Sequence, residues 1–257
     1  MVFEELRSYQ VGDDVRQLDW KATRRTRVPV VRVFKEERER PVYVLLDMQQ
    51  NMFFGSQYRL KVVQAAHLAA LLMWQTVSDG DRFGAIVCGQ QRQLRFLPHR
   101  AENRLLRILQ TLVVCNRELK TNEVNDTGLF SRSLGELACL AKHSADIWLI
   151  SDLEGLSRLP VKILRALVQH NNVTAISMSD PLEKSLPDKG YWSFSNDNQF
   201  LQINMGMPGL HNAFSGQYQE KLSELDQELR LLRIPLIQMC AGEPLKHQLI
   251  HLARGGK

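Results

Sequence analysis

The fold is decided by the stretch Pro41-Val-Tyr-Val-Leu-Leu-Asp47. Its apolar residues follow one another without polar alternation, which is typical of a strand buried on both faces of a parallel sheet. A second run of this kind, Asp146-Ile-Trp-Leu-Ile-Ser-Asp152, also ends in aspartate. Helical spacing over 57–78, followed by the turn signal Asp79-Gly80-Asp81, predicts a first crossover helix. These features indicate parallel strands joined by helices.

The rest of the chain continues this alternation. Gly89-Gln90 separates two strand-like runs as a hairpin turn would, so one edge strand should be antiparallel. Residues 181–209 resemble an inserted hairpin. In addition to 41–47 and 146–152, we expect strands at 28–34, 82–88, 91–97, 173–178, 191–194, 200–204 and 234–240, and helices near 99–111, 131–143, 158–169, 211–232 and 243–254. The predicted fold is an α/β domain over residues 41–257, with a mostly parallel sheet and helices on both faces, after an N-terminal extension over residues 1–40.

Composition predicts a globular protein without a membrane span. Of the 257 residues, 44% are hydrophobic and 24% charged. No apolar run approaches the ~18 residues of a spanning helix. Charges at Glu4, Glu5 and Arg7 leave no apolar segment for a secretory signal. The four cysteines form no CxxC pair, so we expect buried free thiols in a reducing compartment. Together these features predict a cytoplasmic protein.

The net charge of +5 is spread along the chain. Residues 1–40 hold ten Lys or Arg against eight Asp or Glu, which leaves +3 for the remainder. The densest basic cluster, within residues 21–27, contains Arg24, Arg25 and Arg27. We interpret these arginines as a solvated or partner-binding surface, and we expect no nucleic-acid partner. Nucleic-acid binding through them is the weaker alternative, and it would weaken steeply with salt.

Both predicted strands that end in aspartate bring a carboxylate to the carboxyl end of the sheet, where ligands of open α/β sheets collect. Asp47 is followed by the oxygen donors Gln49 and Asn51, and a long polar loop supplies Thr127. An all-oxygen cluster suits Mg²⁺ or Mn²⁺. The candidate ligands are Asp47, Gln49, Asn51, Thr127 and Asp152. The alternative is that the two aspartates cap neighbouring helices and loop amides, and spacing alone leaves both interpretations open.

A longer signature precedes the first buried strand. It reads Phe3-Glu-Glu-Leu-Arg-Ser-Tyr-Gln-Val-Gly-Asp-Asp-Val-Arg-Gln-Leu-Asp-Trp-Lys-Ala-Thr-Arg-Arg-Thr26 and closely resembles the signature of the bacterial family called "domain of unknown function 58". The resemblance covers nearly the whole chain, including Gly80-Asp-Arg-Phe-Gly84 and Ile150-Ser-Asp152. It implies a von Willebrand factor A-like fold and a non-enzymatic interaction or assembly role. The expected partner is a MoxR-type AAA ATPase or its client, in the maturation or activation of other proteins.

The resemblance also implies a metal-ion-dependent adhesion site, built in many such domains from Asp-x-Ser-x-Ser, a loop Thr and a strand-end Asp. The matching positions here are Asp47, Gln49, Asn51, Thr127 and Asp152, so both serines are replaced. Gln49 and Asn51 are longer than serine and would crowd an ion that demands ligands at roughly 2.0–2.1 Å. We therefore expect a degenerate site with weak or absent Mg²⁺ or Mn²⁺ binding, which serines at both positions would strengthen.

The catalytic motifs that the sequence resembles are incomplete. A phosphatase with an aspartate nucleophile would need a second aspartate where Gln49 stands. His247 and His251 have the spacing of a zincin but lack its catalytic glutamate. The remaining alternative is a metal-dependent hydrolase, phosphatase-like or nuclease-like, in which the oxygen cluster activates water. Its general base would be Glu123 or Asp126. We predict that the chain is not an enzyme.

Overall fold

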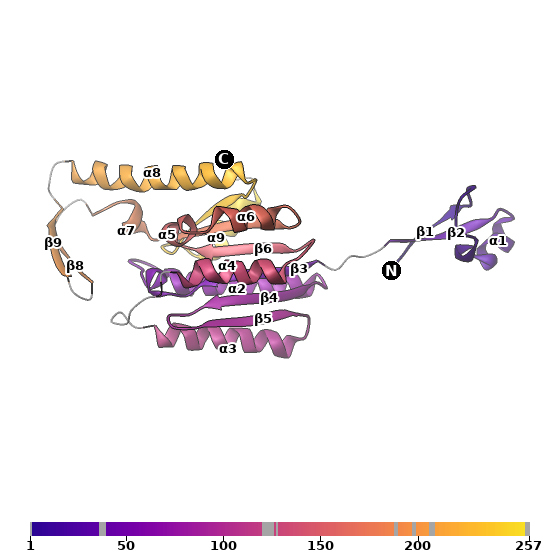
Figure 1. Cartoon of the computed structure of the whole chain (residues 1–257), viewed down its shortest axis with the longest axis horizontal. Helices are drawn as coiled ribbons and strands as arrows, with labels where there is room; N and C mark the ends of the chain where they lie inside the picture. Colours follow the sequence, from indigo (N-terminus) through magenta and orange to yellow (C-terminus); the bar gives the residue numbers. More distant parts are fainter. Residues whose placement is uncertain are drawn as a thin grey trace. The chain divides into compact units, whose positions relative to one another are not determined.

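The structure is a computed structural model that describes residues 2–35, 40–119, 126, 128–187, 190–196, 199–205 and 209–254. The chain divides into two compact units, Met1–Glu39 and Arg40–Lys257. Figure 1 shows the elements of both.

The smaller unit is an antiparallel strand pair with a short helix. Strand β1 (Val2–Ser8) pairs with β2 (Val30–Lys35), and between them lie the 3-10 helix η1 (Val15–Gln17) and α1 (Trp20–Thr26). Asp19 caps α1 by accepting hydrogen bonds from the amides of Lys21 and Ala22, each at 3.0 Å, which satisfies donors that the helix start leaves free. The strand expected near 28–34 is confirmed, whereas β1 was not predicted.

The larger unit is built on a six-stranded sheet of order β10-β7-β6-β3-β4-β5. The strands are β3 (Pro41–Asp47), β4 (Arg82–Cys88), β5 (Gln93–His99), β6 (Asp146–Ser151), β7 (Asn172–Ser179) and β10 (Leu236–Cys240). Only the β4–β5 pair is antiparallel in this sheet, and every other neighbouring pair is parallel. The mostly parallel sheet with an antiparallel edge strand is therefore confirmed. Strand order reverses between β3 and β6.

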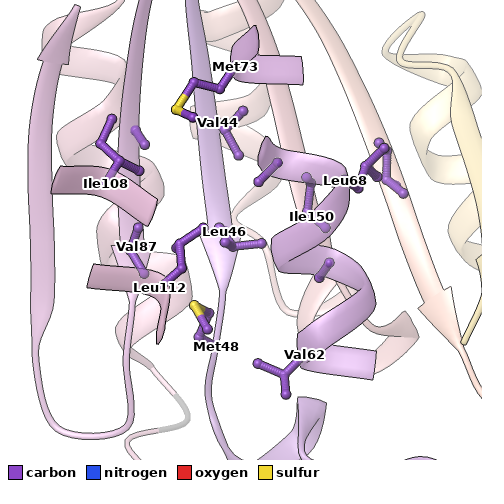
Figure 2. Packing of buried hydrophobic residues seen from close by; sticks show 14 of the residues in the cluster. Val44, Leu46, Met48, Val62, Leu68, Met73, Val87, Ile108, Leu112 and Ile150 are labelled. Carbon is purple, nitrogen blue, oxygen red and sulfur yellow. The ribbon is translucent and has the colours of Figure 1, made fainter. Parts of the chain in front are cut away.

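Helices cover both faces of this sheet. One face packs against α2 (Lys61–Ser78), α3 (Glu102–Glu118) and α9 (Leu245–Ala253). The other face packs against α4 (Leu129–Leu140), α5 (Leu153–Ser157), α6 (Val161–Val168) and α8 (Leu210–Leu231). Residues of β3 alternate between the two cores: Val44 and Leu46 join the first (Figure 2), and Leu45 joins the second. Burial on both faces explains the continuous apolar run of β3.

Shorter elements complete the unit. The 3-10 helix η2 (Gln50–Met52) follows β3, α7 (Pro181–Lys184) follows β7, and β8 (Tyr191–Asn196) pairs antiparallel with β9 (Gln199–Asn204). The inserted hairpin is thus confirmed. All four cysteines are free, but the expectation that each is buried is wrong for Cys139, which is exposed, and Cys240 is only half-buried. Among the described residues, no helix is long and apolar enough to cross a bilayer.

Candidate functional site

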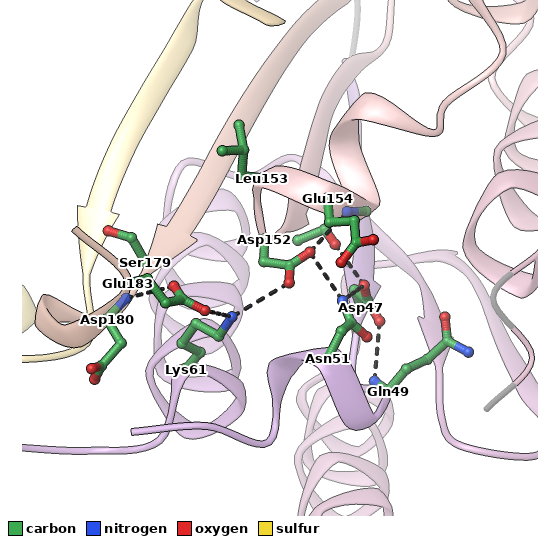
Figure 3. Close-up of polar contacts among 12 residues, drawn as sticks. Asp47, Gln49, Asn51, Lys61, Asp152, Leu153, Glu154, Ser179, Asp180 and Glu183 are labelled. Carbon is green, nitrogen blue, oxygen red and sulfur yellow. Dashed lines mark hydrogen bonds and ion pairs between the residues drawn. The ribbon is translucent and has the colours of Figure 1, made fainter. Parts of the chain in front are cut away.

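The carboxyl ends of β3 and β6 lie side by side at the point where strand order reverses, which is where open α/β sheets bind their ligands. Asp47 is the last residue of β3, and Asp152 directly follows β6. The side chain of Asn51 joins them, because its Nδ2 lies 3.0 Å from Asp47 Oδ2 and 3.0 Å from Asp152 Oδ1 (Figure 3). Three of the five candidate ligands are therefore together.

Asp47 is buried and is held by neutral donors. Its Oδ1 accepts from the backbone amide of Gln49 at 3.0 Å. Its Oδ2 accepts from Asn51 and, at 2.5 Å, from the hydroxyl of Ser151. Burial raises the pKa of Asp47 to about 6, and the nearby charge of Asp152 acts in the same direction, whereas the three hydrogen bonds act against it.

Asp152 differs from Asp47 because a cation contacts it. Its Oδ1 accepts from the backbone amide of Gly155 at 2.8 Å and so caps α5. Its Oδ2 lies 3.4 Å from Nζ of Lys61, whose side chain is only 1% exposed. Lys61 Nζ also lies 2.6 Å from Oε1 of Glu183. Burial lowers the pKa of Lys61, but the charges of Asp152 and Glu183 and the hydrogen bonds to them outweigh it, so the net pKa is raised.

The other candidate residues are placed differently. The side chain of Gln49 points away from Asp47, and its Nε2 donates to the backbone oxygen of Asp126 at 2.8 Å (Figure 3). Thr127, the expected loop ligand, and Glu123, one expected base, lie outside the described residues. The other expected base, Asp126, is exposed and forms an ion pair with Arg132.

The side chains that the structure brings together do not fit a divalent ion. Mg²⁺ and Mn²⁺ need converging oxygen lone pairs. Asn51 instead turns its amide nitrogen toward both carboxylates, and this orientation follows from the network because an amide oxygen would face two acceptors. Among the described residues, no three His, Cys, Asp or Glu side chains are grouped as a metal site either.

A groove of about 620 Å³ lies between α5 and α8, and Asp152 is one of its lining residues. The groove is also lined by Leu153, Phe214 and Tyr218. Its charged lining is mostly acidic and consists of Asp152, Glu154, Glu183, Glu224 and Glu228 against Arg158 and Lys221.

The basic residues of the smaller unit form a separate surface. Arg24 and Arg25 lie in α1, and Arg27 ends that helix in the left-handed region at a φ of 61°. All three side chains are exposed. Their role in binding a partner stays a prediction.

The family model described as "Protein of unknown function DUF58" matches residues 5–223. This chain belongs to that family. Among curated proteins similar to this chain, uncharacterized proteins of Mycobacterium bovis (Mb1516) and Mycobacterium tuberculosis (Rv1480) are each 29% identical over 190 residues. The match covers 72% of this chain and 57% of each relative, so the chain spans little more than half of the proteins it matches.

Solved structures with a similar fold include the conserved hypothetical protein BatB from Bacteroides thetaiotaomicron, at a TM-score of 0.50 and 13% identity, with 84% of this chain and 100% of that chain covered. The SpRpn10 VWA domain has a TM-score of 0.44 and 9% identity, with 83% and 95% covered. The strand order, the antiparallel edge strand and the likeness to BatB confirm the von Willebrand factor A-like α/β fold that the DUF58 resemblance implied.

Several residues that surround the two strand-end aspartates were not predicted from the sequence. Asp180 directly follows β7 as Asp152 directly follows β6, and each comes after a serine, so the repeated Ser-Asp pair was an available signal. Asp180 is fully buried and accepts from the hydroxyl of Ser56 at 2.5 Å. Lys61 shares the buried face of α2 with Ala65 and Leu68. A lysine on an apolar helix face was therefore the second available signal.

Proposed function

We propose that this DUF58 chain is a cytoplasmic, non-enzymatic protein-interaction module. Its partner is a MoxR-type AAA ATPase or the client of one, which it helps to mature or activate. The partner binds the carboxyl end of the sheet, at the groove between α5 and α8. The von Willebrand factor A-like fold supports an interaction role, and the relatives that the chain matches are themselves uncharacterised.

One observation carries the non-enzymatic part of this proposal: both oxygens of each strand-end carboxylate are engaged by donors of the chain itself. Asp47 accepts from Gln49, Asn51 and Ser151. Asp152 accepts from Gly155, Asn51 and Lys61. A nucleophile or general base must instead direct a lone pair at the substrate. These hydrogen bonds therefore suit Asp47 and Asp152 to holding the carboxyl ends of β3 and β6 in place rather than to catalysis.

The hydrolase alternative gains no support from Asp126, the one candidate base among the described residues. The hydrogen bond from Arg132 lowers the pKa of Asp126, which makes this carboxylate a weaker proton acceptor. We expect no phosphatase or nuclease turnover with Mg²⁺ or Mn²⁺. Turnover that Asp47→Asn abolishes would contradict the proposal.

The binding test uses purified full-length chain and the MoxR-type ATPase encoded by the same organism, in the presence of ATP and Mg²⁺. Charge reversal at Glu224 and Glu228 alters the exposed rim of the groove without touching the buried core. We expect this double variant to weaken binding at least tenfold. Glu220→Lys is the matched control, because Glu220 is an exposed residue of the same helix and does not line the groove. Equal binding by wild type and the groove variant would place the interface elsewhere.

The exposed arginines of α1 are a second expected contact. Changing Arg24, Arg25 and Arg27 to alanine should weaken partner binding while leaving the far-ultraviolet spectrum unchanged. Binding of a DNA or RNA fragment that falls steeply with salt and disappears in this variant would instead favour a nucleic-acid partner.

A further inference from the structure

We propose that Lys61 is the built-in cation of this site: its ammonium group neutralises the Asp152 carboxylate at the end of β6, together with Glu183 of α7, in the place of a divalent metal ion. The carboxyl end of the sheet is then complete without metal. This inference concerns the chain alone and does not depend on which partner binds.

The position of Lys61 is unfavourable for a lysine unless carboxylates compensate for it. Lys61 is the first residue of α2, where the partial positive charge of the helix start repels a cation. The first turn of α2 contains no acidic residue, so the helix itself supplies no counter-charge. The side chain is also only 1% exposed, which removes the ammonium from water. Its counter-charges come from the ends of two other elements, as Asp152 follows β6 and Glu183 lies in α7.

A backbone hydrogen bond holds the Glu183 carboxylate beside Lys61. Its Oε2 accepts from the backbone amide of Asp180 at 2.9 Å, and this bond is half of a capping box at the start of α7. Its Oε1 remains for Lys61, at 2.6 Å. Because the buried Asp180 is itself anchored to Ser56, the carboxylate that faces the ammonium belongs to a connected hydrogen-bond network. The geometry around Lys61 is therefore built into the fold.

Lys61 and Asn51 together form hydrogen bonds to carboxylate oxygens that a metal ion would need as ligands. Asn51 Nδ2 donates a hydrogen bond to one oxygen of each aspartate, and Lys61 Nζ donates to the other oxygen of Asp152. A divalent ion at Asp152 would also be repelled by the ammonium on the same carboxylate. Crowding by Gln49 is not required for this exclusion, because the Gln49 side chain is bonded to Asp126.

Thermal unfolding of the full chain in Mg²⁺, in Mn²⁺ and in EDTA tests the proposal. We expect the same Tm for wild type in all three. In Lys61→Ala, Asp152 and Glu183 lose their cation, so the Tm in EDTA should fall by roughly 10 °C. Added Mn²⁺ should then restore part of that loss, because the variant exposes carboxylates to an ion. Lys162→Ala, which changes an exposed lysine of α6, is the matched control. Its Tm should equal that of wild type in EDTA and should not rise with Mn²⁺.

A second variant keeps Lys61 and separates its charge from steric crowding. Gln49→Ser with Asn51→Ser restores the serines of the adhesion motif. If crowding alone excludes the ion, this variant should bind Mg²⁺ or Mn²⁺ in calorimetric titration. Our proposal predicts no binding while Lys61 is present, and binding once Lys61→Ala is added. Metal binding by wild type, metal binding by the double serine variant, or a folded Lys61→Ala that ignores Mn²⁺ would each overturn it.

Discussion

The end of β3 and the end of β6 each present one aspartate at the same edge of the sheet, yet the two carboxylates are stabilised in different ways. Asp47 is surrounded by neutral donors and its pKa is raised to about 6. Asp152 lies against a buried ammonium. The comparison teaches that a strand-end aspartate does not by itself indicate a metal ligand: neutral hydrogen bonds suffice at one strand and an internal lysine at the next.

The largest effect is expected at the β6 end. Lys61→Met keeps most of the side-chain volume but leaves Asp152 without a cation, so the free energy of unfolding should fall by about 4 kcal/mol in urea denaturation. Lys162→Met, on the exposed face of α6, should change it by less than about 0.5 kcal/mol. Adding Asp152→Asn to Lys61→Met should recover part of the loss, because the uncompensated charge is then removed. Strict additivity would show that the two residues are not coupled.

The β3 end should respond to pH instead. Asp47 has a folded-state pKa of about 6, above the ordinary aspartate value of 3.8, so the folded protein binds the extra proton between these values. Its contribution to stability is present below about pH 4 and is lost as pH rises through 6. The loss amounts to about 3 kcal/mol. Asp47→Asn cannot titrate and should flatten this part of the stability curve. Identical curves for wild type and the variant in EDTA would contradict the assignment.

The contact between the two ends should be sensitive to a single methyl group. A Cβ at Gly155 would collide with the hydroxyl of Ser151 and lie 3.1 Å from Asp47 Oδ2. Gly155→Ala should therefore cost about 2 kcal/mol. The control is Gly135→Ala in α4, where the added Cβ meets only Ile163 Cδ1 at 3.8 Å. Because alanine favours a helix interior, this control should be neutral or stabilising by up to about 1 kcal/mol.

The smallest effect is expected at Gln49, whose side chain serves the loop rather than either carboxylate. Gln49→Ala removes the hydrogen bond to the backbone oxygen of Asp126 and should cost about 1 kcal/mol. The pH dependence assigned to Asp47 should survive, because the Gln49 backbone amide still donates to it. An altered pH dependence would show that the Gln49 side chain belongs to the aspartate pair after all.

The fold was largely predictable because its signals are local. Continuous apolar runs gave the buried strands, and strand-end aspartates placed Asp47 and Asp152 at one edge. The buried face of α2 was not predictable, because residues 62–74 are apolar nearly all round. Such a run does not show which side of the helix faces solvent, and in the structure Leu71 is 48% exposed and Trp74 is 42% exposed. Strand β1 was missed because the charged residues Glu4, Glu5 and Arg7 interrupt its apolar residues and because it belongs to a two-stranded pair.

The site was predictable only in part, because its decisive contacts join residues far apart in the chain. Lys61 and Glu183 are 122 positions apart, and no spacing rule links them. The direction of the Asn51 amide likewise depends on having both aspartates in place. Residue types alone suggested an all-oxygen cluster, whereas the three-dimensional arrangement turns an N–H donor and an ammonium group toward the carboxylates.

A crystal structure of the full chain grown in Mn²⁺, with anomalous data, tests the central claim most directly. We expect no manganese peak at the ends of β3 and β6, with Lys61 Nζ between Asp152 and Glu183. A manganese ion bound by Asp47 and Asp152, with Lys61 displaced, would contradict it.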